Sequence, residues 1–135
     1  MIVEEHMTTT QILAHLIGDY WLQSGWMANN KTKNIWVAFM HALTYSLPIV
    51  FLCHPSLYAW LVIVTTHALI DRWRLSRYIS FAKDFLAPER MWPKWKESKD
   101  TGYPNSLPPF LGFWLMIITD NVLHIAINAW ALSNL

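Results

Sequence analysis

Four apolar stretches divide the chain, and each is about long enough to cross a membrane as a helix. A helix needs about 17–25 residues to span a hydrocarbon core of about 30 Å. The stretches cover residues 10–27, 35–53, 57–78 and 110–132. The sequence therefore predicts an all-α integral membrane protein. We expect a four-helix bundle that forms a single domain over residues 1–135, with a cytoplasmic loop at residues 79–109.

Composition supports lipid as the solvent and excludes some partners. The chain is 54% hydrophobic and only 14% charged, whereas soluble domains carry about 25% charged residues. A net charge of +1 leaves no basic excess for a phosphate backbone, which argues against a nucleic-acid partner. Cys53 is the single cysteine, so an internal disulfide is excluded.

The basic residues predict the orientation in the membrane. All ten Lys and Arg residues lie in or beside the first and third connections between the apolar stretches. Loops rich in Lys and Arg remain in the cytoplasm. With four spans, these two connections share the cytoplasmic side. The sequence therefore predicts a multi-pass protein whose N- and C-termini both lie outside the cytoplasm.

Ionisable residues inside the predicted spans are the candidate functional groups. Each costs roughly 2.5–3.5 kcal/mol at the centre of a membrane helix on insertion scales, so such residues pair, line a cavity or perform chemistry. The seven candidates are His15, Asp19, His41, His67, Asp71, Asp120 and His124. Six of them form three His/Asp pairs with i, i+4 spacing, which places both members on one helix face.

The order within the pairs predicts a layered site. His precedes Asp in the first and third stretches, and Asp precedes His in the fourth, which runs in the opposite direction. Each aspartate would then lie one turn nearer the cytoplasm than its histidine. Imidazole and carboxylate groups on facing helices are typical ligands of Zn, Mn and Fe, including dinuclear sites. We therefore expect the seven residues to bind one or two divalent transition-metal ions.

A metal centre of this kind suggests a reaction. Two ions about 3.5–4 Å apart can activate water and stabilise an oxyanion. The sequence therefore favours a membrane-embedded metal-binding protein, with metal-dependent hydrolysis of a lipid-phosphate-like substrate from the cytoplasmic leaflet as its chemistry. Candidate substrate-binding residues at the cytoplasmic mouth are Gln23, Lys31, Lys33, Arg72 and Arg74. The four cations also serve as the positive-inside signal, which accounts for them without any substrate.

Other functions remain open at this point. Buried His and Asp residues can hold helices together through hydrogen bonds worth about 0.6–2 kcal/mol each. Chains of such residues can also relay protons, so a non-enzymatic carrier or channel for protons or metal ions is the alternative function. A third is a membrane factor that acts through protein contacts. Membrane lipid is the one partner that the sequence implies, and an oligomer is compatible with it.

Several segments resemble a known family. They are AHLIGDYWLQSGWMANNKTK (14–33), MHALTYSL (40–47), THALIDRWRLSRYI (66–79) and TDNVLHIAI (119–127). Together they resemble the domain-of-unknown-function family 3307, small membrane proteins of bacteria and their phages. The family pattern falls here on His15, Gly18, Asp19, Gln23, Lys31 or Lys33, His41, His67, Asp71, Asp120 and His124. The resemblance implies location in a bacterial inner membrane, including the host membrane if the protein is phage-encoded, and it implies no established activity.

Overall fold

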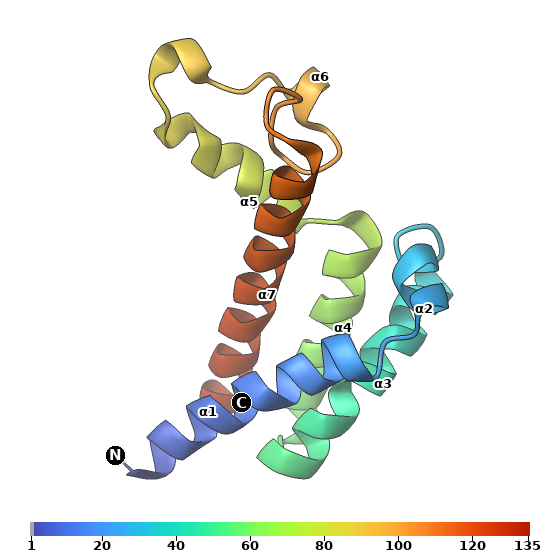
Figure 1. The fold of residues 1–135 in the computed structure, drawn as a ribbon. Coiled ribbons are helices and arrows are strands. Elements are labelled where there is room, and N and C mark those ends of the chain that lie inside the picture. Colours follow the sequence, from blue (N-terminus) through green and yellow to red (C-terminus); the bar gives the residue numbers. More distant parts are fainter. Residues whose placement is uncertain (1) are drawn as a thin grey trace. The chain divides into compact units, whose positions relative to one another are not determined.

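The computed structural model describes the backbone of residues 2–135 and the side chains of residues 7–135. Its regular elements are helices, with no strand in the described residues, so the all-α prediction is confirmed (Figure 1). The longer helices are α1 (Ile2–Leu16), α3 (Ile35–Cys53), α4 (Leu57–Trp73) and α7 (Pro109–Asn134). The shorter elements are the π-helix η1 (Ile17–Trp21), α2 (Gly25–Asn30), α5 (Ser76–Lys83), the 3-10 turns η2 (Asp84–Leu86) and η3 (Glu89–Met91), and α6 (Trp95–Ser98).

Backbone contacts group the chain into two compact units, and the single domain expected from the sequence stays a prediction. Unit 1 contains Met1–Trp73 and His124–Leu135, and unit 2 contains Arg74–Leu123. Helix α7 contributes its first part to unit 2 and its last part to unit 1.

Unit 2 has an aromatic cluster of its own, which explains why the segment predicted as a loop at residues 79–109 is folded. The ring of Tyr78 stacks on Trp95 at 5.1 Å between centroids, and Phe81 contacts the edge of the same Trp95 at 5.1 Å. Phe85 and Trp92 form a further edge contact at 5.6 Å. Aromatic pairs in these arrangements stabilise by about 0.5–1.5 kcal/mol beyond their burial.

Two of the predicted spans are interrupted in the structure. The stretch at residues 57–78 is divided at Arg74, which has a φ of 50°. A residue whose backbone lies in this left-handed region cannot continue a right-handed helix. The stretch at residues 10–27 is helical through η1 only as far as Trp21. A new helix, α2, then begins after Ser24, whose hydroxyl accepts a hydrogen bond from the backbone N–H of Met27 at 3.2 Å, as an N-cap does.

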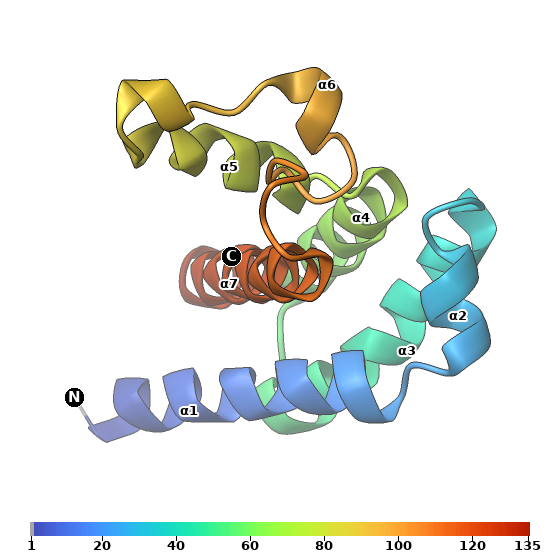
Figure 2. The same ribbon diagram turned by 45° about the horizontal axis from the view of Figure 1, so that its top comes forward.

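Unit 1 is built around the hairpin of α3 and α4. α1 and η1 pack against α3, with α1 running across it in Figure 2. The main buried apolar cluster of unit 1 is small, and the last part of α7 also contributes to it; its members are Ala14, Tyr45, Ile49, Cys53, Ala59, Ile63 and Ala131. Gly18 makes the crossing possible, since a Cβ at this position would lie 2.5 Å from the backbone oxygen of Tyr45.

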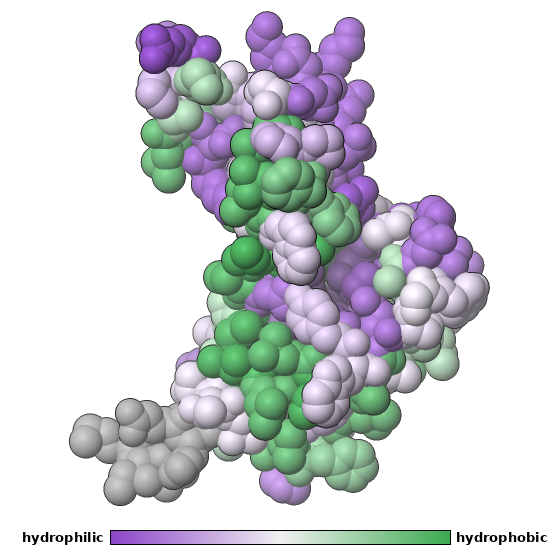
Figure 3. Space-filling model, viewed as in Figure 1, coloured by the Kyte–Doolittle hydropathy of each residue, from purple (hydrophilic) through white to green (hydrophobic). Residues whose placement is uncertain are grey.

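The described side chains combine an extensively apolar exterior with several polar and ionisable groups in the interior. Large apolar residues are exposed, for example Trp21 (81%), Phe51 (71%) and Val122 (61%), while His15 and His41 are completely buried. Hydrophobic residues accordingly cover much of the face seen in Figure 3, and hydrophilic residues gather over α6 and the adjoining loops. Soluble proteins rarely expose apolar patches of this extent, so the exterior fits contact with lipid or a partner.

Among the described residues, two helices, α3 and α7, are long and apolar enough to cross a membrane by length and composition. α4 has 17 residues, which is the lower limit for a span. Membrane association is therefore supported, and the four-span bundle with both termini outside stays a prediction.

Candidate metal centre

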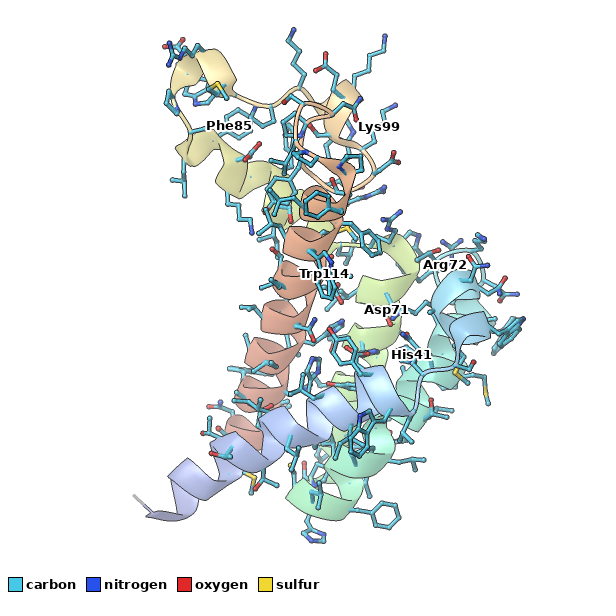
Figure 4. All side chains as sticks on the ribbon, in the orientation of Figure 1. His41, Asp71, Arg72, Phe85, Lys99 and Trp114 are labelled. Atoms are coloured by element: carbon cyan, nitrogen blue, oxygen red, sulfur yellow. The ribbon has the colours of Figure 1, made fainter. Side chains whose placement is uncertain are left out.

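Five of the seven predicted metal ligands lie together in unit 1. They form two groups of three that share His67: Asp19, His41 and His67 in one, and His67, Asp71 and His124 in the other. All five residues are buried, and the ligand atoms of each group lie within 4.8 Å of one another. Figure 4 shows His41 on α3 and Asp71 on α4 pointing into the same space between the two helices.

Each ligand is placed by a different local feature. His67 and Asp71 lie one turn apart on the same face of α4, and His41 and His124 come from α3 and α7. Asp19 lies in the π-helix η1. A π-helical turn is wider than an α-helical one and is frequent at functional sites, because it changes the direction of the side chains in it.

The first group has the dimensions of a metal site. The Nε2 atom of His41 lies 3.1 Å from that of His67 and 3.1 Å from Oδ1 of Asp19, and His67 Nε2 lies 3.4 Å from the same oxygen. An ion with bonds of about 2.0–2.1 Å has ligands about 3.3–3.4 Å apart in tetrahedral geometry. The three atoms therefore match one face of such a tetrahedron.

Asp71 forms a second triangle on the same two histidines. Its Oδ2 atom lies 3.3 Å from His41 Nε2 and 3.2 Å from His67 Nε2. Its other oxygen, Oδ1, lies 3.8 Å from Nε2 of His124. The two oxygens of this carboxylate thus face different histidines, so Asp71 could contribute a ligand atom to either group of three.

Hydrogen bonding alone does not account for this crowding. An imidazole nitrogen carries either one N–H or one lone pair, so it makes one good hydrogen bond. Nε2 of His41 has four polar neighbours within 3.4 Å, namely Asp19, His67, Asp71 and Lys31. A cation among these atoms would satisfy several of them at once.

Ring stacking holds the imidazoles in place. His67 lies between two rings, with centroid distances of 3.7 Å to Tyr45 and 4.1 Å to His124. The Nδ1 atoms of His41 and His67 are buried and have no hydrogen-bond partner. Ring packing on both faces of His67 thus adds to the polar contacts of its Nε2 atom in holding the ring.

His15 lies next to the centre without belonging to either group of three. Its Nε2 atom is 3.6 Å from Oδ2 of Asp19. Its Nδ1 atom is 2.8 Å from the hydroxyl of Tyr45, which also accepts a hydrogen bond from Nδ2 of Asn128 at 2.6 Å. With Asn128 as donor, the Tyr45 hydroxyl can donate to His15 Nδ1, which leaves the proton of His15 on Nε2 facing Asp19. This arrangement suits a residue that orients Asp19.

Tyr45 and Asn128 contact residues of the candidate centre, and the sequence analysis assigns neither of them to the site. Their spacing contains the signal, because Tyr45 follows His41 by four residues and Asn128 follows His124 by four. Both therefore extend the i, i+4 pattern of the ligands by one further turn.

The predicted substrate-binding residues are not all equivalent. Lys31 reaches the centre, with Nζ 2.9 Å from Oδ2 of Asp71. Arg72 donates a hydrogen bond to the backbone oxygen of Thr32 at 2.8 Å. Gln23 is half-buried and Lys33 is exposed. No hydrogen bond or ion pair described for Lys33 or Gln23 joins its side chain to the ligand atoms of the centre.

The predicted metal ligand Asp120 and the predicted substrate-binding residue Arg74 belong to unit 2. Asp120 lies on α7 one turn before His124. Arg74 directs its guanidinium to the sulfur of Met116 at 3.8 Å, within the same unit. Their participation in the centre therefore stays a prediction.

Comparison with known proteins gives the family and no activity. No curated protein and no solved structure matches the chain. A family model described as "Protein of unknown function (DUF3307)" matches residues 7–133, which includes every ligand described above. The chain therefore belongs to the DUF3307 family, as its motifs indicate.

Proposed function

We propose that this protein is a membrane-embedded metal-binding protein whose centre is formed by Asp19, His41, His67, Asp71 and His124. The observation that carries the proposal is the convergence of two carboxylates on the shared pair of Nε2 atoms of His41 and His67, at 3.1–3.4 Å. Nitrogen and oxygen ligands at this spacing suit Zn, Mn or Fe.

The charges of the centre support a divalent ion. Two buried carboxylates carry two negative charges, and buried charges are tolerated only when they are paired or coordinate a metal. Lys31 supplies one positive charge at Asp71. A divalent ion would balance the charges of both carboxylates and would bind the lone pairs of the imidazole nitrogens. The single charge of Lys31 balances only one of the two carboxylates.

Metal analysis of purified protein tests the proposal. The protein is purified without chelator, offered Zn, Mn and Fe, and analysed by elemental mass spectrometry. We expect one or two ions per chain. Asp71→Asn should lower this number because the amide keeps the shape of the side chain and loses the charge. Asp100→Asn, at an exposed position, is the matched control and should retain the metal.

The contrary outcome would show that the buried His and Asp residues only form hydrogen bonds between helices. In that case the parent protein binds no stoichiometric metal, and Asp71→Asn changes its thermal stability in the same way with and without added metal. Circular dichroism of both variants establishes that the helices are retained.

The catalytic form of the proposal is hydrolysis of a lipid phosphate reached from the cytoplasmic leaflet. A bound divalent ion supplies Lewis acidity and lowers the pKa of its water toward 7. The imidazoles and carboxylates of the centre would hold the ion, and a carboxylate oxygen not bonded to it would receive the proton of the water. Phosphatidate and an isoprenyl diphosphate in nanodiscs are suitable substrates, with released phosphate as the readout. Activity that is absent in Asp71→Asn and present in Asp100→Asn supports hydrolysis, and its absence from the metal-loaded parent contradicts it.

A further inference from the structure

Lys31 occupies an unusual position for a lysine. Its Nζ atom lies 2.9 Å from Oδ2 of Asp71 and 3.4 Å from Nε2 of His41. These are two of the atoms that the proposed metal would use. Lys31 also comes from the turn between α2 and α3, so it reaches the centre from outside the helices that carry the ligands.

An ammonium and a metal ion compete for the same atoms here. Nε2 of His41 has one lone pair, and it can accept a hydrogen bond from Nζ or bind a metal but cannot do both. A divalent ion bonded to Asp71 Oδ2 and His41 Nε2 would also be repelled by the nearby ammonium, and at about 4 Å this repulsion remains strong even at an effective dielectric of about 20.

We propose that Lys31 is a built-in cation that holds the centre when no metal is bound, and that metal binding displaces its ammonium group toward solvent. This inference rests on the metal-binding function proposed above and assigns a regulatory exchange to the same site. Lysine suits the role because its charge is carried on a flexible four-carbon stem. Arg72 donates a hydrogen bond to the backbone oxygen of Thr32, the residue that follows Lys31. This contact anchors the turn that carries Lys31, so the displaced lysine remains at the edge of the centre.

The exchange predicts the sign of an affinity change. Lys31→Met removes the charge and keeps the length of the side chain. It should tighten Zn²⁺ binding by about tenfold or more, because the metal no longer has to displace a cation. Lys96→Met is the matched control at an exposed position outside the centre, and should leave the affinity unchanged. Affinity is measured by competition with a chromophoric chelator on detergent-solubilised protein.

Amine labelling provides a second readout on the unaltered protein. Limited acylation with an N-hydroxysuccinimide ester, followed by mass spectrometry, reports the reactivity of Lys31 relative to Lys33 in the same protein. Without metal Lys31 should be protected, since it is engaged with Asp71. With saturating Zn²⁺ its reactivity should rise toward that of Lys33.

The outcomes separate this inference from the proposed function. Zn²⁺ binding with unchanged or weaker affinity in Lys31→Met, and equal protection of Lys31 with and without Zn²⁺, would show that Lys31 supports the bound metal and would overturn the exchange alone. Absence of Zn²⁺ binding in both the parent and Lys31→Met would overturn the metal function and the exchange together.

Discussion

The hydroxyl of Tyr45 connects three helices of unit 1. It lies on α3 and contacts Nδ1 of His15 on α1 and Nδ2 of Asn128 on α7. Its ring stacks on His67 of α4. One side chain thus contacts both His15, which lies beside Asp19, and His67, which both candidate groups share. Outer groups of this kind commonly tune a metal site.

Tyr45→Phe separates the two contributions because it removes the hydroxyl and keeps the ring. We expect a loss of about 1–3 kcal/mol in the free energy of unfolding, since buried polar atoms of Asn128 and His15 lose a partner. Metal affinity should fall by about 10–100-fold with unchanged stoichiometry. Thermal unfolding in detergent and chelator competition measure the two effects.

The control for this substitution is Tyr58→Phe. Tyr58 is 72% exposed, so losing its hydroxyl should change stability by no more than about 0.5 kcal/mol. If Tyr45→Phe behaves like Tyr58→Phe in both measurements, the hydroxyl has no role in positioning the centre.

At the scale of elements, the crossing of η1 and α3 decides where Asp19 lies. Gly18 precedes Asp19 and faces the backbone of Tyr45, where an added Cβ would also lie 2.7 Å from Cδ2 of the tyrosine ring. The close approach therefore requires a residue without a side chain. The same contact brings the Asp19 carboxylate to 3.1 Å from His41 on α3.

Gly18→Ala should push η1 away from α3. Because the nearest atom is backbone, it cannot move aside cheaply, and overpacking of this kind costs about 1–3 kcal/mol. We expect lower thermal stability and weaker metal binding. Gly25→Ala is the control, because nothing lies within 4 Å of a Cβ there, and it should leave stability unchanged or raise it by up to about 1 kcal/mol. Equal stability of the two variants would contradict the close crossing.

At the scale of the whole molecule, the charges predict the topology. The basic residues lie in the turn before α3 and in the segment from the end of α4 to α6, so both should face the cytoplasm. Reporter fusions at Ser133 should then report an exterior location, and fusions within residues 94–101 a cytoplasmic one. Cytoplasmic signals from both fusion sites would refute the four-span arrangement, because α7 lies between them and would then not cross the membrane.

Local spacing is the part of the fold and of the centre that the sequence determined by itself. Helix geometry places residues four apart on one face, so the pairing of His67 with Asp71 follows from the sequence. The length and hydropathy of residues 35–53 likewise indicate a helix, and α3 has these bounds. Polar groups within apolar helices point to the ligand set because their burial is costly.

Relations between helices were decided only by the tertiary structure. Which ligands meet depends on the crossing at Gly18 and on the π-helical turn that carries Asp19. The contact of Lys31 with Asp71 depends on the path of a turn, which loop charge alone does not specify. The aromatic cluster of unit 2 also arises from a contact between residues distant along the chain, Tyr78 and Trp95. Periodicity records the faces of single helices, and packing between side chains selects which faces come together.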